Sequence, residues 1–238
     1  MSSERSGLDL KKPDEFVSLV ETLYTKGVRH KRPFVLSIVA VFAIIFIAFG
    51  YLYWKSSIDR KAAVDFATLT EKVPGASFDS FSMGEDEKKA WDAQVIIADS
   101  KSFLEKHGQS SMAPVAHLYL AKAYVKANQL DLAAQEFASA AKGLRGNDQT
   151  LAKEGLGIVK MSQNDFKGAA EVFQSLVALK ENPNADVHQW NLGLCFEGMG
   201  EVKKAQEAFA LFETKYSNST YAEKAKYRLF AIQHASNV

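Results

Sequence analysis

The chain has 238 residues, of which 47% are hydrophobic and 24% charged, a balance that allows a packed core and excludes wholesale disorder. Its 29 basic and 28 acidic residues leave a net charge of only +1, so no basic surplus is available to bind nucleic acid by neutralising phosphates. Cys195 is the only cysteine, which excludes an intrachain disulfide but leaves the compartment open.

The first strong feature in chain order is an apolar segment behind a short tail, residues 1–32. Between Pro33 and Trp54 the chain carries no charged residue over 22 positions. A helix of that length covers the roughly 30 Å hydrocarbon core of a bilayer, and Tyr51, Tyr53 and Trp54 stand where aromatic rings favour the headgroup zone. The run is longer than that of a cleavable signal peptide and lacks a small-residue cleavage site. We therefore predict an uncleaved signal-anchor helix over residues 33–54.

The charges that flank this helix favour a cytoplasmic amino terminus. Within 15 residues on either side, four Lys or Arg residues precede the segment and three follow it. Arg29, Lys31 and Arg32 lie close before it, whereas the basic residues that follow are mixed with Asp59. Because basic flanks tend to stay in the cytoplasm, the long carboxy-terminal domain is expected on the far side of the membrane.

Residues 55–113 are expected to lead from the membrane into the main domain. The stretch from Ile58 to Lys72 prolongs the membrane helix, and a Pro/Gly/Ser-rich loop follows it. A further helix is predicted from Glu87 to Lys106. The residues expected on its inner side are Trp91, Val95, Ala98, Ser102 and Leu104 or Glu105. Pro114 then opens the next helix, at a position where the missing N–H costs nothing.

Three copies of a 36-residue pattern fill residues 114–217. Five columns agree across the copies without a gap, which chance seldom produces. In each copy a large apolar residue and a small one are followed by a turn residue, an alanine and a phenylalanine. The columns are Leu120, Leu156 and Leu192; Ala121, Gly157 and Gly193; Asn128, Asn164 and Gly200; Ala133, Ala169 and Ala205; and Phe137, Phe173 and Phe209.

This pattern predicts a stack of antiparallel helical hairpins. The small column is expected to face the alanine column, so that the two helices of a hairpin approach closely, and the phenylalanine is expected to fill the space between hairpins. Asn or Gly at the turn column tolerates the left-handed conformation of a tight interhelical turn. The glycines of "WNLGLCFEGMG" are therefore interpreted as packing and turn residues, since the spacing of a phosphate-binding loop is absent.

The columns resemble the tetratricopeptide repeat, a helix–turn–helix unit with leucine, glycine, an aromatic residue, alanine and phenylalanine at set spacing. Tyr124 and Phe196 occupy the aromatic position in the first and third copies, but Lys160 replaces it in the middle copy. The consensus proline is absent, and the period of 36 rather than 34 implies linkers two residues longer. The resemblance implies an all-α fold, in which one transmembrane helix precedes a tetratricopeptide-type solenoid of three repeats with flanking helices.

Residues 218–238 carry a helical pattern that fits a cap on the last repeat. Ser219 or Thr220 is suited to begin this helix. Such a cap shields the apolar end of a repeat array. The apolar residues that recur at helical spacing in it are Tyr221, Ala225, Leu229 and Ile232.

The tetratricopeptide resemblance also implies a concave groove lined by the first helices of the hairpins. The groove positions are mostly apolar here, which suits an amphipathic helix or an extended hydrophobic segment as the bound partner. Periodicity alone does not separate such residues from core or cap contacts. The candidate groove residues are Val115, Leu118, Lys122, Val125 and Lys126 in the first copy; Leu151, Glu154, Ile158, Met161 and Ser162 in the second; and Val187, Trp190, Leu194 and Glu197 in the third.

The sequence holds no recognisable catalytic, cofactor-binding or metal-binding pattern. The five histidines form no H-E-x-x-H or other metal spacing, and His117 and His188 fall within predicted first helices. Cys195 is interpreted as a small core residue. Neither a nucleophile elbow nor a dinucleotide-binding glycine motif appears. We predict that the protein is not an enzyme and takes no cofactor, metal or small-molecule substrate.

A second resemblance concerns the order of the parts. The stretches "AFGYLYWKSSIDRKAAVDFATL" and "FLEKHGQSSMAPVAHLYLAKAYVKANQLDLAAQEF" are similar to the membrane junction and first repeat of the bacterial ancillary SecYEG translocon subunit family. Members have a short cytoplasmic tail, one membrane helix and a periplasmic tetratricopeptide-like domain. The resemblance implies a single-pass protein of the bacterial inner membrane. Its repeats are then expected to engage translocon channel subunits, a periplasmic chaperone or a nascent chain.

Two other function classes fit the same sequence. A different cell-envelope scaffold, such as a division or assembly factor, also combines an anchor with repeats. An import receptor follows if the topology is reversed. In all three classes the membrane is bound through Pro33–Trp54 and the partner is a protein rather than a nucleic acid.

Overall fold

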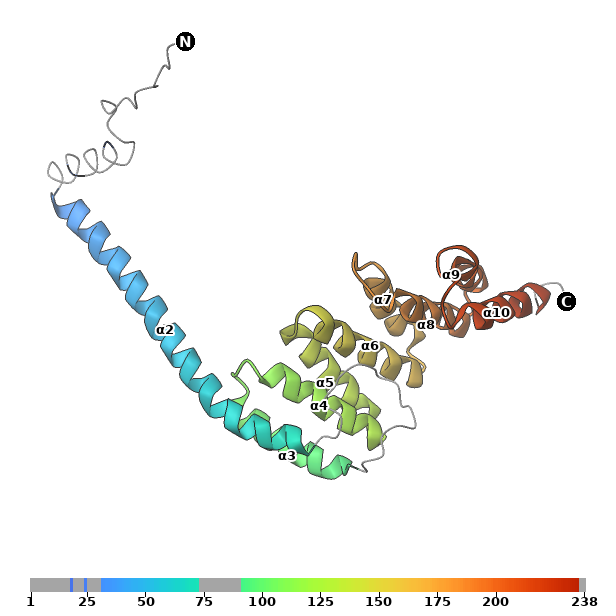
Figure 1. Ribbon diagram of the computed structural model, residues 1–238, viewed down its shortest axis with the longest axis horizontal. Coiled ribbons are helices and arrows are strands. Elements are labelled where there is room, and N and C mark those ends of the chain that lie inside the picture. The colour runs from blue at the N-terminus through green and yellow to red at the C-terminus, as the bar shows by residue number, and fades with distance from the viewer. Residues whose placement is uncertain (1–17, 19–23, 25–30, 73–90, 236–238) are drawn as a thin grey trace, which may run out of the picture. The chain divides into compact units, whose positions relative to one another are not determined.

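Helices form the ordered framework of the part of the chain that the structure describes. The computed structural model describes Ser18, Tyr24 and residues 31–72 and 91–235 (Figure 1). No strand occurs in these ranges, so the predicted all-α class is confirmed. The predicted tail lies outside the described residues before position 31, except for Ser18 and Tyr24. The predicted loop after Lys72 lies outside them as well. The helices are α2 (Lys31–Glu71), α3 (Ala93–His107), α4 (Ala113–Lys126), α5 (Leu130–Gly143), α6 (Gly146–Ser162), α7 (Phe166–Val177), α8 (Ala185–Gly198), α9 (Val202–Thr214) and α10 (Ala222–Ala235).

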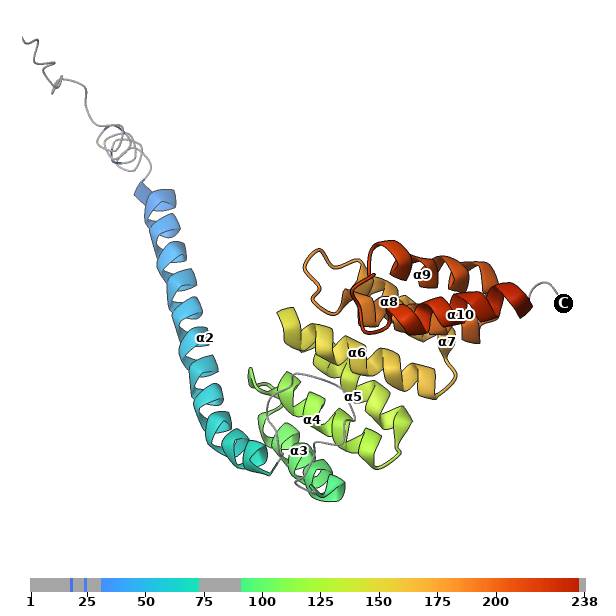
Figure 2. The ribbon, with the colours of Figure 1, turned by 45° about the vertical axis from the view of Figure 1, so that its right-hand side comes forward.

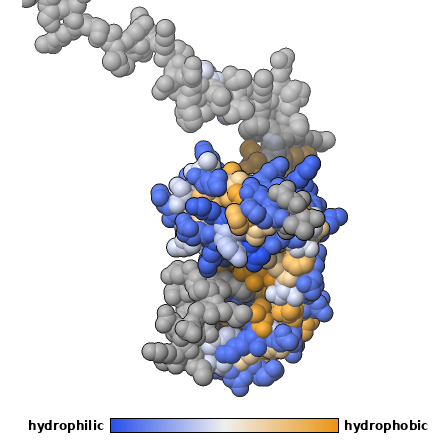
Figure 3. Space-filling model, turned by 90° about the vertical axis from the view of Figure 1, so that its right-hand side faces the viewer, coloured by the Kyte–Doolittle hydropathy of each residue, from blue (hydrophilic) through white to orange (hydrophobic). Residues whose placement is uncertain are grey.

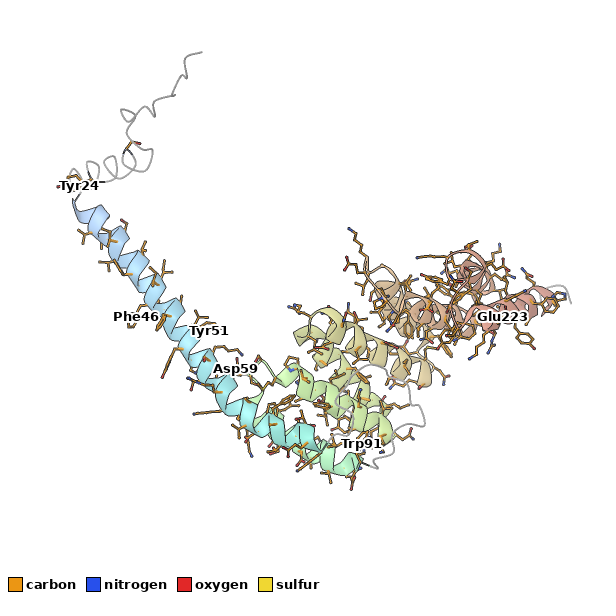
Figure 4. The ribbon with its side chains drawn as sticks, in the orientation of Figure 1. Tyr24, Phe46, Tyr51, Asp59, Trp91 and Glu223 are labelled. Carbon is orange, nitrogen blue, oxygen red and sulfur yellow. The ribbon has the colours of Figure 1, made fainter. Side chains whose placement is uncertain are left out.

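Helix α2 is continuous and contains the whole predicted membrane segment. Its 41 residues extend far beyond Trp54, as expected from the stretch that follows Ile58. The apolar side chains of its first half are exposed; Phe46 is 82% exposed and is drawn with Tyr51 along α2 in Figure 4. Among the described helices, α2 is the one that is long and apolar enough to span a membrane. The chain divides after Ser56 into two compact units, and α2 contributes to both.

Within the second unit, residues 57–238, the end of α2 pairs with α3 and the start of α4. Leu69 and Ala62 are buried at this contact, and the Phe66 ring lies 5.5 Å from the ring of Phe103. Three polar contacts follow one another in antiparallel order. They join Asp59 Oδ1 to the Ser111 N–H at 2.8 Å, Asp65 Oδ2 to His107 Nε2 at 2.7 Å, and Lys72 Nζ to Asp99 Oδ2 at 2.6 Å.

This helical pair takes the place of a hairpin ahead of the three predicted repeats. Helix α3 ends at His107, 36 residues before α5 ends at Gly143, and α3 packs against α4 as α5 packs against α6. Helix α3 therefore has the position of a second helix, and the end of α2 contacts it through side chains. The sequence pattern did not reveal this unit, because Lys101 stands where the repeats carry phenylalanine.

The inner face predicted for α3 is wrong at Val95 and Ala98, whereas Trp91 and Leu104 do pack on the first core cluster. Val95 and Ala98 are exposed, and the helix begins at Ala93 because the side chain of Asp92 caps it by accepting the Gln94 N–H at 2.8 Å. Trp91 precedes the helix and cannot set its phase. The buried residues of α3 are Ile96, Ile97, Ser100 and Phe103.

Three antiparallel hairpins follow, formed by α4 and α5, α6 and α7, and α8 and α9 (Figure 2). The first helices end at Lys126, Ser162 and Gly198, which are 36 residues apart. The second helices begin at Leu130, Phe166 and Val202, again 36 residues apart. The predicted repeat is therefore confirmed, and its most constant part is the turn inside each hairpin.

The turn column adopts the predicted left-handed conformation in all three hairpins. The φ angles are 57° at Asn128, 62° at Asn164 and 72° at Gly200. In the first hairpin the Gln129 N–H donates to the Tyr124 carbonyl at 2.8 Å, and equivalent bonds close the other two turns. This bond satisfies a carbonyl at the end of the first helix and fixes where the second helix starts.

The small column makes room for phenylalanine rather than for the alanine column. A Cβ added at Gly157 would lie 2.7 Å from the Phe173 ring, and one added at Gly193 would lie 2.6 Å from the Phe209 ring. The phenylalanines at this column are fully buried. The ring therefore packs inside its own hairpin, which corrects the expectation that it lies only between hairpins. Phe137 does lie between hairpins, against Gly155 of α6.

The extra two residues of each copy do not consistently lengthen the linkers. Helices α5 and α6 are joined by residues 144–145 alone, because α6 has gained length and spans 17 residues. Helices α7 and α8 are joined by the longer segment 178–184. The linkers between hairpins thus vary while the turns within hairpins stay constant.

Helix α10 packs on α9 and closes the described array. Ala225 and Leu229 are buried and Tyr221 and Ile232 are partly buried, in agreement with the predicted period. Ser219 lies in the turn before the helix, where its Oγ accepts the Tyr221 N–H at 3.1 Å.

Candidate protein-binding groove

The candidate groove residues lie in rows along α4, α6 and α8, and most of them reach the surface. Lys126 and Ser162 are exposed, and ten others are partly exposed. Leu118 and Leu151 are exceptions, because they are only 1% and 8% exposed and belong to the first core cluster. These two are core residues in the described chain, which corrects their assignment to the groove.

Three charged residues of the set are engaged by neighbouring elements. The ammonium group of Lys126 lies 4.1 Å from the centre of the Trp91 ring and donates to the Trp91 carbonyl at 2.9 Å. Glu197 accepts a hydrogen bond from Arg228 of α10 at 2.8 Å. The remaining one, Glu154, faces the buried His188.

The contact of His188 with Glu154 is part of a buried polar cluster between the second and third hairpins. Asn182, in the linker before α8, donates to the Leu176 carbonyl at 2.8 Å and lies 2.9 Å from His188 Nδ1. An amide donor at Nδ1 places the ring proton on Nε2, which lies 3.5 Å from Glu154 Oε2. The histidine is therefore a core residue that is hydrogen-bonded through Nδ1.

Trp190 is partly buried in an aromatic cluster and is not a free-standing anchor. Its ring stacks on Tyr221 with centroids 5.4 Å apart, and it also lies near Phe209 and Phe212. The tryptophan thus joins α8 to α9 and to the turn before α10 while remaining partly accessible. Removing it is expected to affect folding as well as binding.

The surface that remains is mainly apolar. Val115 and Val125 of α4, Ile158 and Met161 of α6, and Leu194 of α8 are partly exposed while packing on the two core clusters. Figure 3 shows one face of the molecule, on which apolar surface gathers in bands between hydrophilic borders. Partly buried aliphatic side chains offer preformed apolar contacts to a polypeptide and little polar chemistry.

No group of three or more His, Cys, Asp or Glu side chains suited to a metal occurs among the described residues. Cys195 is buried in α8, and burial raises the pKa of its thiol to about 12. A thiol in that state is a packing residue rather than a nucleophile.

Trp91, Tyr221 and Arg228 contact candidate groove residues, although the sequence did not place them there. Each belongs to a segment interpreted as a flank or a cap. Tyr221 and Arg228 belong to the last helix and the turn before it, and the bounds of that helix follow those of α8 by 37 residues. The sequence signal that could have found Tyr221 and Arg228 is the 36-residue period, extended by one further copy.

An array of helical hairpins with a row of accessible apolar side chains on its first helices defines a protein-interaction scaffold. The family model of a tetratricopeptide repeat-like domain matches residues 29–183, and that of a tetratricopeptide repeat matches residues 189–219. The first match covers more than half of the chain, so the chain belongs to the tetratricopeptide repeat-like domain family.

Among solved structures, the chain is similar to a crystal structure of nearly identical tetratricopeptide-like repeats from a Podospora anserina protein described as a kinesin light chain. The identity is 16%, the likeness covers 61% of this chain and 79% of that one, and the TM-score is 0.48. No curated protein matches the sequence.

Proposed function

We propose that the protein is a membrane-anchored scaffold whose apolar groove binds a segment of another polypeptide. The observation that carries the proposal is the row of partly exposed aliphatic residues on α4, α6 and α8, typified by Val125, Ile158 and Leu194. The charges of Lys126, Glu154 and Glu197 beside them are engaged within the chain, so the partner meets chiefly apolar surface. An amphipathic helix or an extended hydrophobic segment has the matching chemistry.

The same proposal extends to the Sec translocon. The sequence resembles the ancillary subunit family at the membrane junction and in the first repeat, and the chain has one long apolar helix followed by repeats. We infer a single-pass protein of the bacterial inner membrane, with a cytoplasmic tail over residues 1–32, a span over 33–54, and the repeats of 114–217 and their flanking segments in the periplasm. The anchor associates with the channel, and the groove receives a chaperone or an emerging chain. No catalytic step is assigned to it.

Affinity purification of the full chain from mildly solubilised membranes tests both parts. Met161→Glu places a charge in the groove, and Leu132→Glu on α5 is the matched control because Leu132 is an exposed apolar residue on a second helix. Channel subunits are expected with all three proteins, because the anchor is unchanged. The chaperone or nascent chain is expected with the wild type and the Leu132 variant only.

Two results contradict the proposal separately. Absence of channel subunits in reciprocal purifications removes the translocon assignment. Equal recovery of the soluble partner with Met161→Glu removes the groove assignment.

A further inference from the structure

The joint between the second and third hairpins holds two polar side chains at positions that are apolar elsewhere in the array. Glu154 of α6 is one period of 36 residues from Leu118 and from Trp190. His188 of α8 is one period from Ala152, which is fully buried. Core packing alone would favour apolar residues at both positions, as in the other copies. Two departures from the repeat pattern that meet at one joint indicate a role beyond the core.

The contact between these two residues leaves the histidine incompletely hydrogen-bonded. His188 is fully buried, and its Nδ1 is occupied by the amide of Asn182. Its Nε2 lies 3.5 Å from Glu154 Oε2 and makes no hydrogen bond within the described residues. Buried polar groups are nearly always paired, so this N–H, directed at the carboxylate, is an exception that requires an explanation. The Glu154 carboxylate is attracted from its buried side but is not fixed there by a hydrogen bond.

Glu154 also lacks a strong cation of its own in the described part of the chain. Its side chain is only 12% exposed, and its recorded ion-pair contact is the one with His188. By contrast, Glu197 of the same candidate groove is paired with Arg228 of α10 at 2.8 Å. A carboxylate that is so little exposed has lost most of its contact with water, and a cation on its accessible side would compensate for that loss.

The apolar residues beside Glu154 determine what can bring such a cation. Ile158 and Met161 follow it on α6 by four and seven residues, so all three lie on one face of the helix. Both apolar residues are partly exposed and pack on the second core cluster. A bound segment whose apolar side chains lie on Ile158 and Met161 therefore places another of its side chains over Glu154.

We infer that the groove selects a polypeptide segment in which a Lys or Arg residue stands among apolar ones, and that Glu154 receives the basic side chain. The inference rests on the proposed function, because it specifies the chemistry of the segment that the same groove binds. A basic group donates a charge-assisted hydrogen bond to the carboxylate, while its aliphatic stem lies on the apolar surface. An acidic residue at that point of the segment would be repelled, so Glu154 also excludes segments.

Binding of matched peptides to the full chain tests the inference. The probe is an amphipathic peptide of about 15 residues whose apolar face carries one guest residue, Arg, Gln or Glu. The chain is held in nanodiscs of phosphatidylcholine, which has no net charge, and empty nanodiscs give the background. Fluorescence anisotropy is expected to show the Arg form binding at least about tenfold more tightly than the Gln form, as for a hydrogen bond to a charged group. The Glu form is expected to bind most weakly.

Three variants locate this preference. Glu154→Gln is expected to bring the Arg and Gln forms within about twofold of each other, because the carboxylate is gone while a polar side chain remains. Glu154→Leu restores the residue that Leu118 provides in the first copy and is expected to lose the preference in the same way. Glu171→Gln removes the same charge from an exposed position on α7, and it is expected to keep the full preference. Circular dichroism checks that each variant is folded.

Equal binding of the Arg and Gln forms to the wild type overturns the inference, and a water molecule then completes the polar pair. A preference for Arg that persists in folded Glu154→Gln or Glu154→Leu protein overturns it as well. In both cases the groove assignment stands if Met161→Glu abolishes binding of all three peptides. Binding that Met161→Glu leaves unchanged, or no binding of any form, removes the groove assignment and the inference with it.

Discussion

At the scale of single residues, the second and third hairpins are held by a pairing of glycine with phenylalanine. Phe173 and Phe209 are fully buried, and each lies against a glycine of the facing helix that leaves no room for a side chain. The alanine column is fully buried as well. Spacing in the sequence identified all these positions as packing residues. It did not identify which column faces which, because periodicity gives the side of a helix and not the partner across the interface.

Gly193→Leu is expected to destabilise the array by about 1–3 kcal/mol, because even a Cβ at this position lies 2.6 Å from the Phe209 ring. Urea unfolding of the full chain in detergent, followed by tryptophan fluorescence, measures the change. Gly200→Asn is the control, since Asn128 and Asn164 occupy the same left-handed turn position in the other hairpins. A Leu variant as stable as the Asn variant would falsify the glycine–phenylalanine pairing.

The middle copy replaces the aromatic residue of the pattern by a polar set. Lys160 Nζ lies 2.5 Å from Asp165 Oδ2, and Asp165 also caps α7 by accepting the Gly168 N–H at 2.9 Å. The hydrogen bond from Lys160, followed by that from Gly168, holds the pKa of the Asp165 carboxyl below its usual value. The departure of Lys160 from the pattern thus has a local explanation.

Because the folded-state pKa of Asp165 is lowered, its ionised form stabilises the fold above about pH 3.8, and this contribution is lost as the pH falls through the folded-state pKa. Asp165→Ala is expected to cost about 1 kcal/mol at pH 7 through the lost cap. Asp165→Asn keeps a capping oxygen and is expected to cost roughly a few tenths of a kcal/mol, since the pair is exposed to solvent. Urea midpoints at pH 7 and pH 3 measure both. An Asn variant whose deficit does not shrink at pH 3 contradicts the ionic contribution.

At the scale of helices, the end of α2 is a working part of the array. Ala62, Phe66 and Leu69 face α3 and α4, while Val64 on the same helix is 68% exposed. The predicted helical continuation after Ile58 was confirmed as far as Glu71, but its packing role was not foreseen. The reason is physical: the segment between α2 and α3 is long, so the constant turn that marks every other hairpin is missing from the sequence.

Leu69→Ala is therefore expected to destabilise the array by about 2–5 kcal/mol, the usual cost of truncating a buried leucine. Val64→Ala is expected to change stability by less than about 0.5 kcal/mol, as for an exposed site. Urea unfolding distinguishes them. Equal stability of the two variants would show that α2 does not pack on the repeats.

Helix phase was predicted less well than helix existence. Val95 and Ala98 were wrongly placed on the inner face of α3, because Trp91 was counted as helical whereas the Asp92 cap starts the helix after it. The period of α10 was predicted correctly, since Ala225 and Leu229 are buried. A single capping residue or packed side chain thus decides where a helix begins and which of its faces is buried. Sequence periodicity alone does not determine either.

At the scale of the whole molecule, a helix that is long and apolar enough to span a membrane precedes an interaction scaffold. The repeat period predicted the fold, since each hairpin buries its face only against its neighbours. The sequence predicted the row of candidate groove residues, of which twelve reach the surface and two, Leu118 and Leu151, are buried. Burial of Leu118 and Leu151, and the stacking of Trp190 on Tyr221, depend on contacts between helices that are distant in sequence. These contacts separate core from surface, and a one-dimensional pattern does not contain them.

The central claim is that the apolar row on α4, α6 and α8 receives a polypeptide. A photoreactive amino acid placed in the full chain at Met161 or Leu194, and at Leu132 as the control, tests it directly in native membranes. We expect discrete adducts with a periplasmic chaperone or an emerging secretory chain at Met161 and Leu194, and none at Leu132. Adducts of equal yield at all three positions, or none at the two groove positions, would contradict the claim.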